Sequence, residues 1–202
     1  MFIEELTKET VAKIMALKGE ARGVVFKTDS EFVLREKGAA GLAAVEKELV
    51  RLGQPIKYQA IATMAFYPVG LRALSLLVIG RTFDFNEEKI KEMGFHATKV
   101  SLIIKLFVKY FFSIQQAFFK EAPKIWRRHW TQGKIEPVSL DEEGKTAVLR
   151  VVDFNLHPVF CHYLEGYFSG ILHMLIKAPQ IQSQETKCFF RGDNFHEYIF
   201  KW

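Results

Sequence analysis

The stretches that decide the fold are CHYLEGYFSGIL at residues 161–172 and ETKCFFRGDNFHEYIFKW at residues 185–202. The first belongs to a run over about 158–176 whose apolar spacing predicts a helix with a proline in its first turn. Gly166 and Gly170, four positions apart, let another backbone approach this helix closely. The second stretch holds two strand-like runs around Arg-Gly-Asp-Asn, which is a hairpin turn signal. Together they predict a helix that packs on a hairpin.

Upstream of these stretches, the sequence predicts helices first and strands later. Helices are expected over residues 3–17, 42–52, 68–79 and 87–93, and a long helical region over 96–131 with a kink near Pro123. Residues 23–38 contain two β-rich runs around Thr-Asp-Ser and predict a hairpin. Residues 134–140 and 146–154 predict two strands joined through Asp-Glu-Glu-Gly. This order favours an α+β fold, an antiparallel β-sheet with helices packed on one face.

The charge pattern excludes some classes of protein. The 202 residues carry 28 Lys and Arg against 23 Asp and Glu, a formal net charge of +5. The charges are spread along the chain, which argues against a dedicated nucleic-acid-binding protein. The basic and aromatic cluster at residues 126–130 is better explained as a helix end where cations are favoured. The length and the lack of a linker or repeat favour a single domain over residues 1–202.

The expected location of the protein follows from what the sequence does not contain. No secretory signal follows Met1, and two cysteines do not make a disulfide scaffold, so we expect a cytoplasmic protein. The richest apolar stretch, residues 100–119, contains Lys105 and Lys109, which are costly in the centre of a membrane. We therefore expect no membrane span.

Four residues in the deciding stretches have the chemistry of a zinc site. Cys188 and His196 flank Gly192 at equal distances in sequence, so a hairpin centred there makes them cross-strand neighbours. Cys161 lies on the preceding helix, and Glu185 precedes Cys188 by three positions. Two thiolates, an imidazole and a carboxylate can close a tetrahedral Zn²⁺ site.

This arrangement requires an irregularity in the strand that carries Glu185 and Cys188. In a regular strand these two side chains point to opposite faces, so a bulge or knuckle must lie between them. The alternative is that both cysteines are small core residues and that Glu185 is solvated. A Cys161–Cys188 disulfide is disfavoured in a reducing compartment.

Nineteen phenylalanines bring the aromatic share of the chain to 14%. Many rings fall in the 96–131 region opposite a polar stripe that includes Lys105, Lys109 and Lys120, which leaves a wide apolar arc. Such an arc is buried in a core, at a dimer interface or around an apolar ligand. The candidate ligand-binding residues are Phe107, Phe111, Trp126, Trp130, Tyr163 and Tyr167.

The two deciding stretches resemble the C-terminal signature of the 4-vinyl reductase domain family. This family belongs to a wider superfamily with the TRAPP vesicle-tethering subunits and haem NO-binding sensors. The signature is a Cys, a Gly- and Tyr-rich helix, Glu-x-x-Cys, a Gly-Asp or Gly-His turn and a closing Cys. Cys161, Glu185 and Cys188 match its zinc ligands, and His196 stands where the family has its last cysteine. The upstream part is similar to a myxobacterial-type family of proteins of comparable length.

The resemblance implies a TRAPP-like and 4-vinyl-reductase-like fold that serves as a non-enzymatic sensor. Its ligand would be a small apolar or aromatic molecule, and a structural zinc ion would hold the nearby hairpin in place. The resemblance also implies a homodimer formed through the N-terminal helices. A separate signalling partner protein is expected because no output domain is evident in the sequence.

Three alternatives accompany this hypothesis. A scaffold that resembles the TRAPP subunits would hold a lipid chain or a partner helix in an apolar groove. A haem-binding gas sensor would use His96 or His129 as an axial ligand, and haem is a weaker expectation than zinc. An enzyme that acts on a tetrapyrrole side chain is disfavoured, because no Ser-His-Asp set, HExxH or Gly-x-Ser-x-Gly is present.

Overall fold

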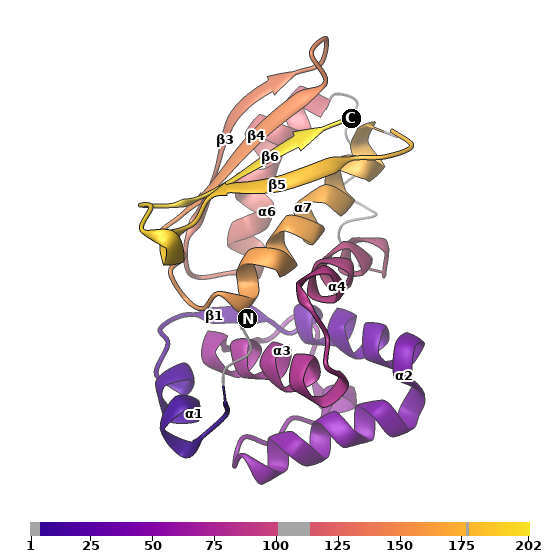
Figure 1. The fold of residues 1–202 in the computed structure, drawn as a ribbon, viewed down its shortest axis with the longest axis vertical. Coiled ribbons are helices and arrows are strands. Elements are labelled where there is room, and N and C mark those ends of the chain that lie inside the picture. Colours follow the sequence, from indigo (N-terminus) through magenta and orange to yellow (C-terminus); the bar gives the residue numbers. More distant parts are fainter. Residues whose placement is uncertain (1–4, 101–113, 177) are drawn as a thin grey trace.

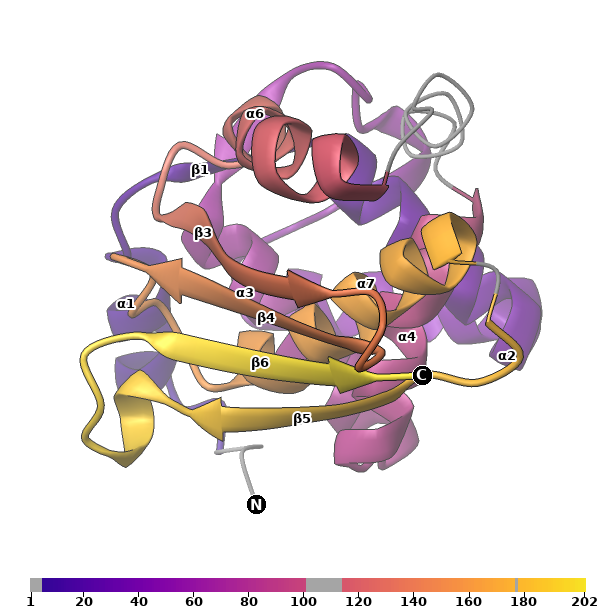
Figure 2. The ribbon, with the colours of Figure 1, turned by 90° about the horizontal axis from the view of Figure 1, so that it is seen from above.

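The computed structural model describes residues 5–100, 114–176 and 178–202. Its upper part in Figure 1 is a four-stranded antiparallel sheet in the order β3-β4-β6-β5. The strands are β3 (Lys134–Asp141), β4 (Thr146–Val152), β5 (Gln182–Lys187) and β6 (His196–Lys201). Helices α6 (Ala122–His129) and α7 (Val159–Ile176) cover one face of this sheet (Figures 1 and 2), so the expected α+β fold is confirmed.

The central strands show why this segment of the sequence forms a sheet with one covered face. Along β4, Ala147, Leu149 and Val151 are buried against the helices, and the residues that alternate with them are partly exposed. Along β6, the rings of Tyr198 and Phe200 are fully buried on the same side as His196. This alternation is typical of an antiparallel strand with one face on the core.

The lower part of the molecule in Figure 1 is helical. It contains α1 (Lys8–Met15), β1 (Glu20–Arg22), α2 (Val24–Arg51), the 3-10 turn η1 (Tyr58–Ala60), β2 (Phe66–Pro68), α3 (Val69–Phe83) and α4 (Glu87–Val100). A π-helical turn, η2 (Gln116–Glu121), leads into α6 just before Pro123, where the sequence predicts a kink. Within the part of the chain that the structure describes, no helix is long and apolar enough to cross a membrane.

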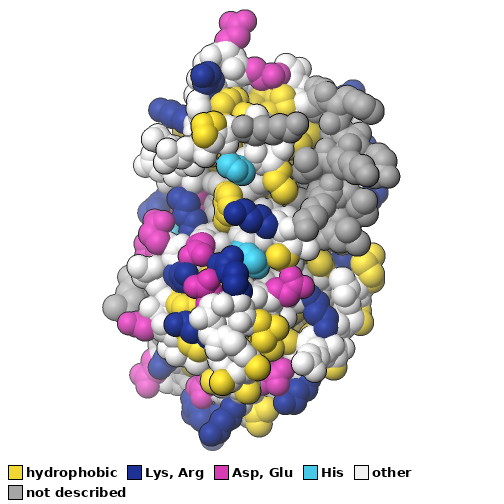
Figure 3. Space-filling view, turned by 90° about the vertical axis from the view of Figure 1, so that its right-hand side faces the viewer, with side chains coloured by type: hydrophobic (Ala, Val, Ile, Leu, Met, Phe, Trp, Pro, Cys, Tyr) yellow, Lys and Arg dark blue, Asp and Glu magenta, His cyan; other side chains and the backbone are white. Residues whose placement is uncertain are grey.

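Ion pairs join the exposed sides of α2 and α4. Arg35 contacts Glu92 at 2.8 Å, and Lys89 contacts Glu36 at 2.6 Å. Figure 3 shows charged side chains of both signs gathered around the middle and lower part of this face. Exposed pairs of this kind contribute about 0–1 kcal/mol each, so the buried contacts below decide how the helices sit.

The hairpin expected over residues 23–38 is wrong, because this segment forms the first half of α2. Thr28 and Ser30, which suggest a turn, donate hydrogen bonds at 2.9 and 2.8 Å to backbone carbonyls three positions earlier in the helix. Their hydroxyl groups are therefore satisfied without a turn. Gly38 still marks a break, since its φ of 68° interrupts the helical backbone inside α2.

Asp29, between those two hydroxyl residues, forms a buried ion pair with Arg72 of α3. Both residues are fully buried; Arg72 Nη2 donates to Asp29 Oδ1 at 3.0 Å, and a second contact joins Nη1 and Oδ2. Burial raises the pKa of Asp29 to about 7, although the Arg72 guanidinium acts in the opposite direction. Arg72 also lies 4.7 Å from the ring centroid of Tyr163 in α7. The pair therefore connects α2, α3 and α7 inside the core.

Helices α4 and α7 approach each other until backbone meets backbone. A Cβ added at Gly166 would overlap the carbonyl oxygen of Lys91, and one added at Gly94 would overlap that of Tyr163. The close approach expected at Gly166 and Gly170 is confirmed, since an added Cβ at Gly170 would also overlap a residue of α4. The helix expected to end at Gly94 instead continues, because this glycine makes room for the other helix.

A Gly166→Ala substitution tests this contact. We expect it to lower the free energy of unfolding by about 1–3 kcal/mol, because a methyl group here forces the two helices apart. The measurement is urea unfolding followed by circular dichroism. In a loosely packed helix the same change would be stabilising by about 1 kcal/mol, so a gain in stability would contradict the contact. Gly144→Ala is the control, since its added Cβ would meet only the flexible side chain of Asp141.

Candidate metal centre and ligand cavity

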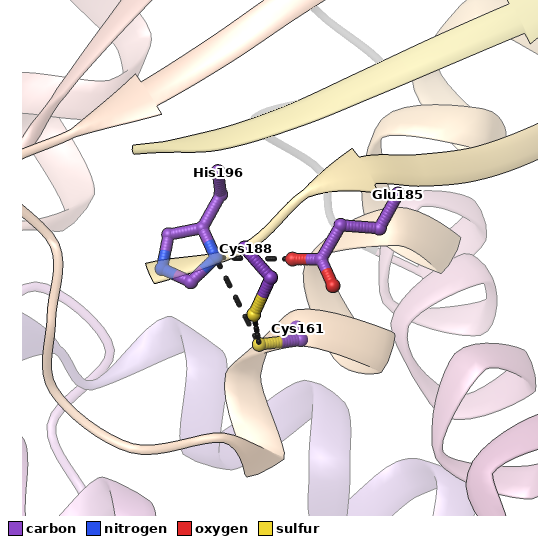
Figure 4. Close-up of side chains that lie close together, drawn as sticks. All are labelled: Cys161, Glu185, Cys188 and His196. Carbon is purple, nitrogen blue, oxygen red and sulfur yellow. Dashed lines mark hydrogen bonds and ion pairs between the residues drawn. The ribbon is translucent and has the colours of Figure 1, made fainter. Parts of the chain in front are cut away.

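The four residues that the sequence predicts as zinc ligands lie together in the structure (Figure 4). Their ligand atoms, one from each residue, all lie within 4.8 Å of one another. The contributing segments are the first turn of α7 (Cys161), β5 (Glu185), the residue before the 3-10 turn η3 (Cys188) and the first residue of β6 (His196). A metal ion here would therefore fasten both strands of the C-terminal hairpin to α7.

β5 contains the irregularity that the spacing of Glu185 and Cys188 requires. Glu185 pairs with Tyr198 and Lys187 pairs with Glu197, so β5 advances two residues where β6 advances one. The extra residue is a β-bulge, which changes the side to which the following side chains point. The bulge explains why Glu185 and Cys188 both reach the cluster.

Hydrogen bonds between Cys188 and the residues that follow it stabilise the turn. The Cys188 N–H donates to Asp193 Oδ2 at 2.8 Å, and the Cys188 carbonyl accepts from the N–H groups of Arg191 and Asp193 at 2.9 and 3.2 Å. Gly192 has a φ of 98°, in the left-handed region that favours glycine. The Arg-Gly-Asp sequence thus fixes the direction of Cys188 and returns the chain to His196.

The spacing of the ligand atoms is near that of a tetrahedral zinc site, and the most distant pairs, up to 4.8 Å apart, would have to move closer around an ion. Sγ of Cys161 lies 3.7 Å from Sγ of Cys188 and 3.9 Å from Nδ1 of His196, and this nitrogen lies 3.0 Å from Oε1 of Glu185. Ordinary zinc bond lengths in a tetrahedron put neighbouring ligand atoms roughly 3.3–3.8 Å apart. His196 Nε2 lies 3.3 Å from the Phe154 carbonyl. In the tautomer that donates from Nε2, the Nδ1 lone pair is available to the metal.

The electrostatics of the cluster favour a cation. Burial raises the pKa of the Cys161 thiol far above its usual range, and the negative charge of Glu185 raises it further. Burial and Glu185 raise the pKa of the Cys188 thiol as well. Arg191 contacts the outer Glu185 oxygen, Oε2, at 3.3 Å, which leaves Oε1 facing the cluster. Both thiols therefore stay protonated until a metal ion displaces their protons.

An apolar cavity of about 50 Å³ lies between α6, α7 and the sheet. Three residues predicted as ligand-binding line it: Trp126, Trp130 and Tyr167. Further lining residues, which carry no ligand-binding signal in the sequence, come from α7 and the strands, among them Ile135, Leu149, Ile171, Leu172 and Phe200. The apolar spacing of these residues in the sequence indicates only that they belong to a core. The cavity forms because of how the helices and strands pack against one another.

The remaining predicted ligand-binding residues are placed differently. Tyr163 lines a smaller cavity of about 20 Å³ between α2, α6 and α7, which Tyr167 and His129 also line. This volume is enough for about one water molecule. Phe107 and Phe111 lie outside the described residues, so their part in ligand binding stays a prediction.

Comparison with solved structures identifies the architecture. An H-NOX protein from Shewanella oneidensis in its Fe(II)NO ligation state superposes with a TM-score of 0.66 at 14% identity, over 89% of this chain and 98% of that one. A Tt H-NOX variant gives a TM-score of 0.64 at 13% identity, over 90% of this chain and 94% of that one. The chain has an H-NOX-like fold. The chain shares this architecture with these H-NOX proteins at low sequence identity.

The same comparison with a Cs H-NOX variant gives a TM-score of 0.63 at 13% identity, over 89% of this chain and 95% of that one. No protein-family profile matches the sequence, and no curated protein matches it significantly. At these identities the likeness shows the fold, and the chemistry has to be read from the residues of this chain.

Among the described residues, the side chains around α6, α7 and the sheet do not fit a haem group. The two cavities measure about 50 and about 20 Å³, whereas pockets for ligands of drug size or larger measure about 300–1,000 Å³. Rings fill the region where α6 meets the sheet: Trp126 stacks on Trp130 at 5.6 Å between centroids, and Phe154 packs edge-on against both at 5.1 and 5.4 Å. A haem would have to displace these rings.

The two histidines considered as axial ligands differ. His129 Nδ1 lies 2.9 Å from the Ile125 carbonyl and donates to it, and burial lowers the pKa of the ring, so a neutral imidazole with a free Nε2 lone pair results. His96 Nδ1 accepts from Arg35 Nη1 at 2.7 Å, which leaves its proton on Nε2. Only His129 therefore has the protonation state of a metal ligand.

Metal analysis tests the cluster. We expect about one zinc per chain after purification or zinc titration, and a loss of at least about 100-fold in zinc affinity in Cys188→Ser or His196→Ala, because each removes one of four ligands. The measurement is elemental analysis together with competition against a chelating dye. His173→Ala is the matched control, since the ring of this histidine packs against Phe95, with 5.8 Å between the ring centroids, away from the cluster. Wild-type protein that takes up no zinc would contradict the site.

Proposed function

We propose that this chain is a sensory domain that binds a small apolar molecule in the α6–α7 cavity and uses a structural zinc ion to hold the β5–β6 hairpin against α7. The observation that supports this most directly is that the cavity and the metal cluster are built from the same elements. One end of α7 supplies Cys161 to the cluster, and the other end supplies Ile171 and Leu172 to the cavity. β6 likewise carries His196 at the cluster and Phe200 at the cavity.

Phe154 joins the two sites directly. Its carbonyl oxygen lies 3.3 Å from His196 Nε2, and its ring packs against Trp126 and Trp130 in the cavity wall. A ligand that moved either tryptophan would therefore displace Phe154, whose carbonyl orients His196. Protein cores are packed as densely as organic crystals and are hardly compressible, so a displaced side chain displaces its neighbours. This contact provides a short route between ligand and hairpin.

In this proposal the zinc ion, when bound, stabilises the structure and takes no part in a reaction. With all four residues as ligands, the site would be closed and would leave no open position for a substrate. The residues of the chain would do the rest: the two cysteines would bind the ion as thiolates, which together balance its charge of +2, and the Phe154 carbonyl orients His196. A sensory rather than enzymatic role agrees with this closed site.

The finer resemblance to 4-vinyl reductase domains supports the same proposal. The cluster contains Cys161, Glu185 and Cys188, which match that family's zinc ligands, with His196 in place of its closing cysteine. Within this proposal the signal passes to a separate partner protein, and the chain acts as a homodimer. A scaffold that resembles the TRAPP subunits would share the fold but would have no use for a small ligand.

A thermal-shift series tests the ligand site. We expect toluene to enter by widening the cavity, since a cavity that binds benzene measures about 150 Å³. It should then raise the melting temperature, because a ligand that binds only the folded state adds about 2.7 kcal/mol of stability at 100 times its Kd. Ala122→Leu should remove this shift, because three added carbons occupy the cavity that Ala122 lines. Gln115→Leu, which adds a similar side chain at an exposed position of the preceding turn, should keep it.

A different pattern would overturn the ligand proposal. No shift with toluene, benzene or phenol would favour the scaffold, because its apolar groove would be filled by a lipid chain or a partner helix. An equal shift in wild type and Ala122→Leu would place the binding elsewhere on the molecule.

A haem sensor is the second candidate function, and the neutral His129 side chain favours it together with the shared fold. Our proposal expects no sharp Soret band when hemin is added, because the cavities are too small. A band that appears in wild type and is lost in His129→Ala would replace the apolar-ligand proposal with haem sensing. His173→Ala serves again as the control.

A further inference from the structure

The outer edge of β5 has no role in the proposed sensor. β5 is the last strand of the sheet and, among the described residues, pairs only with β6. The N–H and C=O groups on its other side point away from the sheet. Such groups are a template on which another extended chain can pair, and proteins usually block them.

The two edges of the sheet differ in how they are blocked. β3, at the opposite edge, contains Pro137, a bulge between Pro137 and Ser139, and charges at Lys134, Glu136 and Asp141. All of these discourage pairing with another strand. β5 begins with Gln182, Ser183 and Gln184, which carry neither charge nor proline. The first half of β5 is therefore the open edge.

This open edge borders a groove. A hollow of about 410 Å³ lies between the start of β5, α7 and α4, with Ser183 and Gln182 on one side and Glu88, Lys91 and Glu92 on the other. Figure 2 shows α4 extending beyond the outer side of β5. Ser183 donates to Glu165 of α7 at 2.8 Å, so this part of β5 is fixed to the helix beneath it. An incoming chain would meet a rigid edge.

The charges in the groove favour a basic occupant. Lys91 is already engaged with Glu165 at 2.6 Å, and Glu92 contacts Arg35 at 2.8 Å and Lys89 at 2.7 Å. Glu88 differs, since its carboxylate makes no ion pair within the described part of the chain. Among the described residues that line it, the groove thus presents one carboxylate without an ion pair, beside the uncharged first half of the β5 edge. Farther along β5, the Glu185 carbonyl accepts a hydrogen bond from Arg191 at 3.2 Å.

We propose that β5 takes up an extended basic segment of a partner protein as an additional strand, with a Lys or Arg side chain on Glu88. Backbone hydrogen bonds would supply affinity and the acidic rim would supply specificity, as in other cases of strand addition. The inference rests on the proposed sensory function, because such a sensor needs a protein to which it passes its signal. β5 also carries Glu185, so the strand that docks the partner is the strand that the metal cluster holds.

Peptide binding combined with hydrogen exchange tests the inference on the full chain. The probe is a fluorescein-labelled Lys-Val-Lys-Val-Lys-Val peptide, measured by anisotropy. We expect binding with slower amide exchange over residues 180–187, and an affinity about fivefold lower in Glu88→Lys, in line with the reversal of one exposed charge. Glu142→Lys is the matched control, because this exposed residue lies in the β3–β4 turn.

Three outcomes would overturn the inference: no binding, equal binding of a Glu-Val-Glu-Val-Glu-Val peptide, or protection over residues 134–141 instead of 180–187. An unchanged affinity in Glu88→Lys would also count against it. The zinc content and the toluene shift are measured on the same sample. If both hold while the peptide fails, the docking edge is wrong and the sensor proposal stands; if both fail, the sensor proposal itself is wrong.

Discussion

The contact on which the rest of the structure depends is the backbone approach of α4 and α7. Helix α7 lies under the sheet, and α4 belongs to the helical part, so this contact joins the two parts backbone to backbone. Glycines at Gly94 and Gly166 allow it, because any side chain there would overlap the carbonyl oxygens of the other helix. A contact made by backbone atoms leaves little room for sliding. The cavity, the metal cluster and the β5 groove all take their positions from α7.

The cluster and the cavity then depend on how the C-terminal hairpin sits on α7. The bulge in β5 and the glycine turn at Gly192 bring two ligands to the buried face, and β6 supplies the third. Phe154 lies between this cluster and the two tryptophans of the cavity wall. The fold places these groups within a few side chains of each other although they are far apart in sequence.

The predictable part of the site is the part encoded by local spacing. Cys188, Gly192 and His196 are equally spaced about one turn, and the three-residue step from Glu185 to Cys188 requires the bulge that β5 contains. The sheet was predictable for the same reason, since alternation and turn residues are local signals. Residues of the cavity wall such as Ile135 and Ile171 carry no such signal, because only tertiary packing brings them together.

The hairpin predicted over residues 23–38 is wrong because of a contact that is distant in sequence. Thr28, Asp29 and Ser30 together suggest a turn, yet Asp29 is held in a helix by an arginine 43 positions away. A partner so distant leaves no trace in the local pattern. Tertiary contacts of this kind override weak local preferences. The predicted helix end before Gly94 is wrong for a similar reason. In a sequence, a glycine that ends a helix cannot be distinguished from one that lets a neighbouring helix approach.

The Asp29–Arg72 pair also constrains how this protein can change over evolutionary time. Replacing either residue alone leaves a buried charge without its counterpart, at a cost of about 3–5 kcal/mol, whereas replacing both by apolar residues is often close to neutral. Mutational drift at these two positions should therefore proceed in paired steps. Divergent descendants of this chain would be expected to keep both charges or to have lost both, and an intermediate with one charge would be short-lived.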